Sequence, residues 1–258
     1  MVVYSHSKIR SFEQCPLKFK FKYIDNAPPD FEQTIEGFLG DKIHQTLKWL
    51  YDKKIEERNI QLDDLIFYFA ENWKRDFKEK IKISNGELNV DYYLKQGIQF
   101  LINYFNSNYP FKDNTIATEK KIIIPLDESK DYHVIGYIDR LVHNKEENTF
   151  EIHDYKTGNS IRTQEELDKD KQLAIYCLGI KHIFKDVKEI NLIWHFLAFN
   201  KKMFSKRTDE ELENLKLEIL DLIKKIESAK EFLPNPSPLC KWCEFQSRCP
   251  AINPTQKL

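Results

Sequence analysis

The chain has 258 residues, of which 41% are hydrophobic, and this is enough to bury the core of one elaborated domain. Its 40 basic and 41 acidic residues leave a formal charge of -1, which excludes a generally basic surface, so any nucleic-acid surface would be a local patch. No apolar run approaches the roughly 20 residues of a membrane helix, and the N-terminal stretch lacks the apolar core of a signal peptide, so we expect a cytoplasmic protein with no membrane partner.

The first segment, residues 4–24, predicts two short helical stretches separated by a kink. Ser5 and Ser7 are candidate N-caps, and Pro16 interrupts an otherwise helical pattern of apolar residues. Cys15 lies directly before this proline. A single cysteine in such a position is more often a small buried residue than a ligand, so its interpretation depends on the other cysteines.

Three helices are predicted next, over residues 34–58, 61–83 and 88–109. Apolar residues recur in each at helical spacing, and a buried core is the simplest interpretation. His44 falls within the apolar pattern of the first helix, where a lone histidine is usually a core residue. Lysines and aromatics alternate around Trp73, so this insertion could instead line a groove for single-stranded nucleic acid.

A β-hairpin is predicted over residues 134–156, because two strand-like runs flank a polar turn. Side chains alternate along a strand, so Asp154 and Lys156 share one face, and Asp139 can lie opposite them across the hairpin. Two carboxylates and one amine at one end of a sheet could hold a hard divalent cation and place a base beside its bound water. The alternative interpretation is a hairpin with exposed charges at its end.

Two segments flank this hairpin. The strand expected at residues 115–126 carries Glu119, which could lie at the edge of the site or be exposed, and we leave it outside the metal ligands. A capping-box pattern predicts one helix over residues 163–183. Gln172 and Tyr176 lie four residues apart on it and share a face. By themselves they are only a polar residue and an aromatic on a partly buried helix.

The remaining predicted elements are a strand at 189–199, a shorter strand at 203–206 and a long amphipathic helix at 208–231. His153 projects from the face of its strand opposite to Asp154, and His195 belongs to a strand. Neither histidine receives a functional assignment.

Five cysteines in a chain expected to be cytoplasmic argue against a disulfide framework. Cys177 is interpreted as a core residue. The spacing of Cys240, Cys243 and Cys249 allows three thiolates to bind one metal centre, and a fourth is needed. Cys15 can supply it, which would tie the first helix to the C-terminus. The thiolates alone suit zinc as well as an iron–sulfur cluster.

Several motifs resemble those of the PD-(D/E)XK nuclease superfamily, in its RecB-like branch. Residues 136–140, GYIDR, and 154–158, DYKTG, are similar to its G-x-I-D-R and D-x-K-T-G signatures. Residues 40–44, GDKIH, resemble its G-x-x-x-H motif, and 170–176, DKQLAIY, contain its Q-x-x-x-Y element. The segment at residues 5–24 and the four-cysteine set resemble the iron–sulfur closure of AddB-type and CRISPR-associated nucleases.

The resemblance implies an α/β fold, with a restriction-endonuclease-like mixed β-sheet, flanking helices, an N-terminal helical subdomain and a cysteine-ligated cluster that joins the termini. All 258 residues would form one nuclease domain. Within it, a helical subdomain would span about 25–112, a catalytic core 113–207, and an iron–sulfur closure residues 1–24 together with 208–258.

The resemblance also implies a site with one or two Mg²⁺ or Mn²⁺ ions. The implied metal ligands are His44, Asp139, Asp154 and the backbone carbonyl of Tyr155. The implied catalytic set is Asp139, Asp154, Lys156, Gln172 and Tyr176. Within this set, Lys156 would orient or deprotonate the nucleophile, and the last two would position the nucleic acid strand. A [4Fe–4S] cluster, with zinc as the alternative, would be held by Cys15, Cys240, Cys243 and Cys249.

The implied function is a metal-dependent DNA nuclease, expected to be an exonuclease on single-stranded or unwound DNA ends in repair, recombination or CRISPR spacer acquisition. The sequence has no G-x-x-x-x-G-K-[ST] motif, so unwinding would need a helicase partner, and a CRISPR adaptation integrase is the other expected partner. The alternative is a non-cutting, DNA-binding iron–sulfur subunit of such a complex. The intact acids and lysine count against it, because a subunit that does not cut has no need of them.

Overall fold

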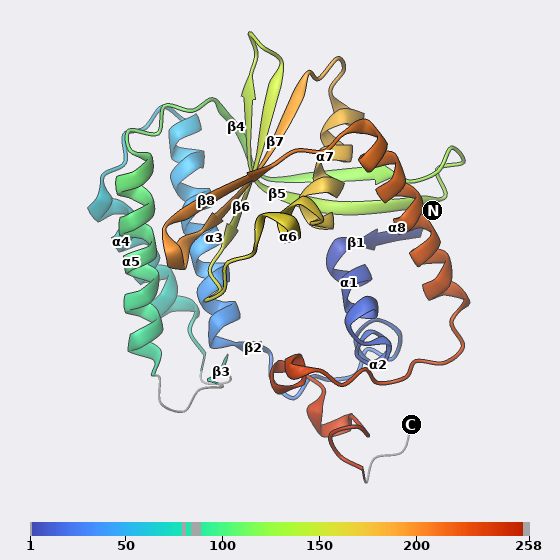
Figure 1. Cartoon of the computed structure of the whole chain (residues 1–258). Helices are drawn as coiled ribbons and strands as arrows, with labels where there is room; N and C mark the ends of the chain where they lie inside the picture. The colour runs from blue at the N-terminus through green and yellow to red at the C-terminus, as the bar shows by residue number, and fades with distance from the viewer. Residues whose placement is uncertain (1, 79–80, 84–88, 255–258) are drawn as a thin grey trace.

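The computed structural model describes residues 2–78, 81–83 and 89–254, and a mixed sheet with helices on both faces forms its centre (Figure 1). The chain is therefore a mixed α/β protein, as predicted. The strands of the main sheet are β1 (Val2–Ser5), β4 (Thr115–Pro125), β5 (Tyr132–Asn144), β6 (Thr149–Lys156), β7 (Glu189–Phe196) and β8 (Lys201–Ser205). The two short strands β2 (Gln33–Thr34) and β3 (Ile81–Lys82) pair separately.

The sheet forks along β5. One edge of β5 pairs with β4, and the other edge pairs first with β1, along residues 132–135, and then with β6, along residues 140–144. Strand β6 continues to β7 in parallel, and β8 closes that edge in the antiparallel sense. On this edge, residues 136–139 of β5 therefore have no partner strand. The gap that they leave between β1 and β6 lies beside the predicted acids.

Strand β1 was not predicted from the sequence, whereas the N-cap predicted at Ser5 is confirmed. Helix α1 (His6–Gln14) begins only after the strand, where the Ser5 side chain accepts a hydrogen bond of 3.1 Å from the Lys8 amide. The valines before it favour a strand, but the parallel partner is more than a hundred residues away in sequence, so local pattern could not reveal the pairing. The predicted kink is confirmed, since α1 ends before Cys15 and α2 (Pro16–Phe19) follows, with a π-helical turn at Lys20–Ile24.

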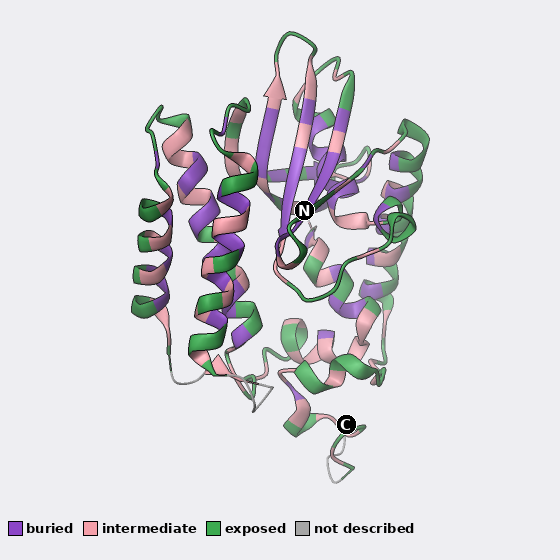
Figure 2. Cartoon of the chain, turned by 60° about the vertical axis from the view of Figure 1, so that its left-hand side comes forward, coloured by how far each residue is buried: buried purple, intermediate pink, exposed green. Residues whose placement is uncertain are grey.

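The helices divide into two groups with separate cores. Helices α3 (Ile35–Ile55), α4 (Leu62–Asp76) and α5 (Val90–Asn108) pack together and against one side of the sheet. Helices α1, α7 (Lys171–Ile183) and α8 (Asp209–Ser228) enclose the other core (Figures 1 and 2). In the part of the chain that the structure describes, none of these helices has the length and apolar composition required to cross a membrane.

Two predicted helix boundaries were wrong. The second predicted helix ends at Asp76 rather than near residue 83, and the predicted start at residue 88 lies outside the described residues. The helix predicted over 163–183 is two helices, α6 (Gln164–Asp168) and α7. The capping box of Thr163 and Glu166 starts α6 as expected, but Asp170 starts a new helix by accepting a 3.1 Å hydrogen bond from the Leu173 amide. The break between α6 and α7 therefore had a signal in the sequence, because Asp170 is a typical N-cap residue.

Gly97 lets α5 approach α3 and α4 closely. A Cβ at this position would lie 2.4 Å from Phe69 Cζ and 2.8 Å from Leu39 Cδ1, and both side chains are buried. We expect Gly97→Ala to lower the free energy of unfolding by about 1–3 kcal/mol in urea denaturation, because overpacking outweighs the better helix propensity of alanine. Gly158→Ala is the control, since a Cβ there meets nothing within 4 Å, and equal losses in both variants would contradict this explanation.

Candidate active site

At the gap in the sheet, His44 of α3 contacts both strands of the β5–β6 hairpin. Its Nε2 atom donates a hydrogen bond of 2.9 Å to the backbone carbonyl of Tyr155, and its Nδ1 atom lies 3.3 Å from Asp139 Oδ2. The same carboxylate oxygen accepts a 2.9 Å hydrogen bond from the Tyr155 amide. Three of the four predicted metal ligands, which come from α3, β5 and β6, therefore meet at one point.

The predicted lysine and the residues of α7 form a connected chain beside these groups. Lys156 Nζ lies 3.0 Å and 2.8 Å from the two carboxylate oxygens of Asp154 and donates a 3.1 Å hydrogen bond to Gln172 Oε1. Gln172 Nε2 in turn donates to the Tyr176 hydroxyl at 3.3 Å. Asp154 is buried, and although its Oδ2 lies near the ammonium, it makes no well-directed hydrogen bond to any described residue. That oxygen has lone pairs available to a cation.

Glu119 of β4 belongs to this site, although the sequence analysis left it outside the metal ligands. Ligand atoms of His44, Glu119 and Asp139 all lie within 4.8 Å of one another, whereas Asp154 is not part of this group. Glu119 has a φ of 46°, a left-handed backbone conformation that is unusual inside a strand. Such strain persists where surrounding structure enforces it, and it clusters at functional sites.

Crowded negative charge alters the protonation of the site. Burial lowers the pKa of His44, but the attraction of Asp139 and its hydrogen bond more than reverse this, and the pKa rises to about 9. Burial, with repulsion from Asp139, raises the pKa of Asp154 and of Glu119. In the metal-free protein a charged imidazole thus holds Asp139 and the Tyr155 carbonyl together, as a metal cation would. The donors of the site, carboxylates with one imidazole and one carbonyl, fit a divalent ion such as Mg²⁺ or Mn²⁺.

Two motif glycines make room for this arrangement. A Cβ at Gly136, in the gap of the fork, would lie 2.4 Å from the Tyr176 ring, so the ring rests directly on the β5 backbone. A Cβ at Gly40 would lie 3.2 Å from Thr157 Oγ1, which indicates a close approach of α3 to the end of the hairpin. The glycines of the G-x-I-D-R and G-x-x-x-H patterns are thereby explained by packing.

His6, to which the sequence analysis gave no role, lies near Lys156. Burial lowers its pKa to about 4, with Arg10 and Lys156 lowering it further and Asp170 opposing them. The imidazole is therefore neutral at neutral pH. Its position follows from the pairing of β1 with β5, which the sequence pattern did not reveal.

The sequence matches the model of the PD-(D/E)XK nuclease superfamily over residues 3–250, which is nearly the whole chain. The chain belongs to this superfamily. Its nucleases usually use divalent metal ions, in accordance with the donor set described above. No curated protein sequence is significantly similar to this PD-(D/E)XK chain.

Solved structures are similar to this PD-(D/E)XK protein at low sequence identity. The crystal structure of a "Putative exonuclease" from Eubacterium rectale superposes with a TM-score of 0.54 at 11% identity, over 98% of this chain and 88% of that one. The crystal structure of the protein SSO0001 gives a TM-score of 0.40 at 18% identity, over 80% of this chain and 96% of that one. At such identities the first of these supports the fold alone.

Outside the sheet of this PD-(D/E)XK protein, four of the five cysteines line one pocket. Cys15, Cys240, Cys243 and Cys249 surround it together with apolar side chains, whereas Cys177 is buried in the core as predicted. The backbone amide of Asn235 lies 3.4 Å from Cys15 Sγ and that of Ser237 lies 3.4 Å from Cys240 Sγ, so both can donate to a thiolate. The two ends of the chain thus bring together the predicted thiol set.

Polar contacts hold these ends together around the pocket. Glu244 accepts from Lys18 at 2.9 Å and from Lys22 at 3.1 Å, and Asp30 accepts from the Ser247 amide at 2.9 Å. In Figure 1 the C-terminal segment runs beside α2. Such partly exposed ion pairs contribute little stability individually.

Glu119→Gln provides a test of the carboxylate that the structure added to the site. We expect Mn²⁺ to bind this variant at least about tenfold more weakly, because one of the clustered anions is lost while side-chain volume is kept. Mn²⁺ binding to the metal-free protein can be followed by electron paramagnetic resonance. Glu128→Gln, which changes an exposed glutamate in the turn after β4, should bind Mn²⁺ like the wild type. Equal Mn²⁺ affinity in both variants would exclude Glu119 from the metal site.

Proposed function

We propose that this PD-(D/E)XK protein is a Mg²⁺- or Mn²⁺-dependent DNA nuclease, and that it acts as an exonuclease on single-stranded or unwound DNA ends. The observation that carries the proposal is the convergence of His44, Glu119 and Asp139 beside the buried ion pair of Asp154 and Lys156. Grouped anions with an adjacent amine are costly to fold, and hydrolysis of a phosphodiester is the chemistry they suit.

In this proposal His44, Asp139, Asp154 and the Tyr155 carbonyl hold the metal, with Glu119 as a further carboxylate. A bound ion lowers the pKa of water and neutralises charge on the attacked phosphate. His44 must lose a proton to become a ligand, so its raised pKa would make metal binding release that proton. The Oδ2 atom of Asp154 makes no well-directed hydrogen bond to any described residue, and this supports a place for the carboxylate among the ligands.

Lys156 is the proposed group that orients or deprotonates the nucleophile. Asp154 and Gln172 hold its ammonium from two sides, and Gln172 is in turn held by Tyr176. These contacts fix the amine at the edge of the anionic cluster, where an attacking water would lie. The products would carry 5′-phosphate and 3′-hydroxyl ends.

We further propose that Cys15, Cys240, Cys243 and Cys249 hold a structural [4Fe–4S] cluster. Among the described residues, no three of these sulfurs lie within 4.8 Å of one another. Thiolates around one zinc ion would be about 3.8 Å apart, given Zn–S bonds of about 2.3 Å. In a [4Fe–4S] cluster each thiolate binds a different iron, so the sulfurs need not approach one another this closely. The two amides that point at sulfur would stabilise the thiolates of either centre.

The proposed biological setting is the cytoplasm, in DNA repair, recombination or CRISPR spacer acquisition. A helicase or an adaptation integrase would be the partner, and the whole chain would act as one nuclease domain with a helical subdomain and an iron–sulfur closure. The second candidate is a DNA-binding subunit that does not cut. The intact set of His44, Asp139, Asp154 and Lys156 favours the nuclease.

The experiment is digestion of 5′- and 3′-end-labelled DNA, single-stranded and duplex, by anaerobically purified protein in Mn²⁺. We expect the single strand to be degraded, and the label that disappears first gives the polarity. Asp154→Asn, purified in parallel, should leave both substrates intact. A folded wild type that binds DNA and Mn²⁺ without cutting would support the binding subunit instead.

A further inference from the structure

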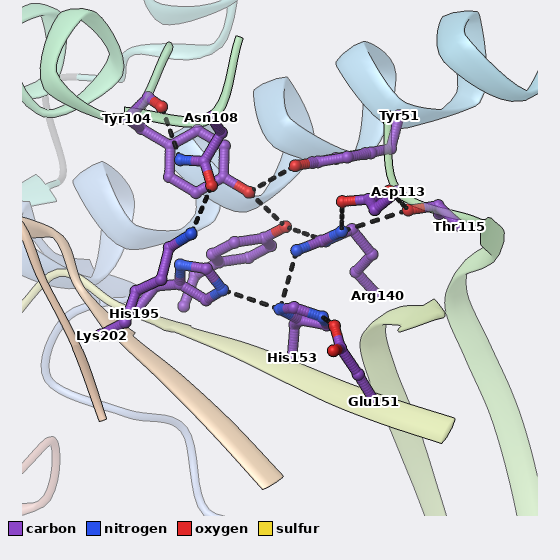
Figure 3. A network of polar contacts seen from close by, with 11 residues as sticks. Tyr51, Tyr104, Asn108, Asp113, Thr115, Arg140, Glu151, His153, His195 and Lys202 are labelled. Atoms are coloured by element: carbon purple, nitrogen blue, oxygen red, sulfur yellow. Dashed lines mark hydrogen bonds and ion pairs between the residues drawn. The ribbon is translucent and has the colours of Figure 1, made fainter. Parts of the chain in front are cut away.

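A buried polar network lies beneath the catalytic hairpin, on the side of α3 and α5 (Figure 3). Its centre is Arg140, the residue after Asp139, which is only 2% exposed. Arg140 Nε donates to the Tyr155 hydroxyl at 3.0 Å, and its Nη1 atom forms an ion pair with Asp113 and donates to Thr115 Oγ1 at 3.2 Å. A guanidinium buried in this way is costly unless each of its donors has a partner.

The hydrogen bond from Arg140 favours one donor-to-acceptor order among the hydroxyl groups of this network. Arginine only donates, so the Tyr155 oxygen accepts, and its own proton is free to go to Tyr104, whose oxygen lies 3.2 Å away. The Tyr104 hydroxyl can then donate to Tyr51 at 2.7 Å. Arg140 thereby orders a chain of three phenols that joins β6 to α5 and α3.

Two histidines complete the surroundings of Arg140. The Nδ1 atom of His153 accepts from Arg140 Nη2 at 2.7 Å and lies 2.8 Å from His195 Nε2, so the proton of His153 is on Nε2 and is donated to Glu151 at 3.0 Å. Each Arg140 nitrogen is thus held, and the guanidinium has one orientation.

Tyr155 links this network to the candidate metal site. Its ring is fixed from below by Arg140 and Tyr104, while its backbone amide and carbonyl bond Asp139 and His44 above. Its neighbours in the chain are Asp154 and Lys156. Loss of the anchor on the Tyr155 hydroxyl would therefore allow the whole residue to move, together with its carbonyl and both flanking groups.

We propose that Arg140 and Tyr104 are positioning residues that act through the Tyr155 phenol to hold the Tyr155 carbonyl in place for a divalent metal ion. This inference rests on the proposed nuclease function, because that function assigns the carbonyl to the metal. It gives the arginine of the G-x-I-D-R pattern in this chain a role in metal affinity, and it makes the helical insertion, through Tyr104, part of the support for the site.

The test measures Mn²⁺ binding to metal-free protein, without DNA, by electron paramagnetic resonance, in Tyr155→Phe, Tyr104→Phe and the double variant. We expect each single change to weaken Mn²⁺ binding about tenfold or more, in the range of outer-shell partners of metal ligands. The double variant should bind like Tyr155→Phe alone, since Tyr104 acts through the hydroxyl that is already missing. Cutting by Tyr104→Phe should recover at saturating Mn²⁺.

Tyr93→Phe is the matched control, because Tyr93 is also a buried tyrosine of α5 and donates instead to Glu36 at 2.9 Å. It should leave Mn²⁺ affinity unchanged. Lower melting temperatures with unchanged Mn²⁺ affinity, additive losses in the double variant, or an equal loss in the control would each overturn the proposal. A wild type that never cuts DNA, combined with the expected affinity changes, would reject the nuclease and leave the positioning role supported.

Discussion

Asp154→Asn is expected to reduce DNA cleavage at saturating Mn²⁺ by about 10³-fold, near the upper end of what a single charge-stabilising group contributes. The variant keeps the shape of the side chain but removes a buried anion that forms an ion pair with Lys156. The substitution therefore removes two proposed roles of one carboxylate, which are to bind the metal and to orient the Lys156 amine. Initial rates on end-labelled single-stranded DNA are the measurement.

The same substitution is expected to stabilise the metal-free fold. Burial, followed by repulsion from Asp139, raises the pKa of Asp154 despite the opposing Lys156, so the ionised carboxylate is less favourable in the native than in the unfolded state. Asparagine removes that penalty, and the melting temperature in chelator at about pH 8 should exceed that of the wild type. The difference should shrink as the pH falls from about 6 and should vanish below about 3, where the wild-type carboxyl is protonated in both states.

Asp221→Asn serves as the control, because this aspartate is exposed on α8. Its cleavage rate and melting temperature should match those of the wild type. Loss of cleavage through unfolding would appear as a lower melting temperature of Asp154→Asn. Undiminished cleavage by the folded variant would remove Asp154 from the active site.

Removal of one of the proposed cluster ligands is expected to have the largest effect on stability. Cys240→Ser, or chelation of the wild type, should lower the melting temperature by about 10 °C or more, since structural metal centres contribute several kcal/mol and each kcal/mol corresponds to about 2–4 °C at this size. The C-terminal segment is poorly anchored otherwise. Phe245 is buried against Phe21, and the remaining contacts are partly exposed ion pairs such as that of Glu244 with Lys18 and hydrogen bonds such as that from the Ser247 amide to Asp30.

Iron, sulfide and zinc analysis of anaerobically purified protein identifies the centre, and differential scanning calorimetry gives the melting temperature. Cys177→Ala is the matched control, because Cys177 is buried on α7 and outside the pocket. It should retain the full metal content even if a small cavity costs some stability. A chelated protein that melts at the wild-type temperature would contradict a structural role.

Much of the fold and site could be predicted because the signals were local. Period-two runs with a polar turn predicted the hairpin of Asp139 and Asp154, and helical spacing predicted the helix of His44 and the shared face of Gln172 and Tyr176. The structure places all of these side chains around one point, although their individual roles stay predictions. Glu119 was not predicted as a metal ligand, because a strand carboxylate beside two lysines has no distinguishing sequence pattern. Its left-handed backbone conformation depends on packing.

The sequence by itself determined the family, the chemistry of the site residues and the set of thiols, since residue types at fixed spacing carry that information. Only the tertiary structure decided that β1 pairs in parallel with β5, that Glu119 joins His44 and Asp139, and that Arg140 turns inward beneath Tyr155. The physical reason is sequence separation. Each of these features forms only when residues from distant segments meet, and the free energy that holds them there comes from burial and paired charges rather than from local propensity.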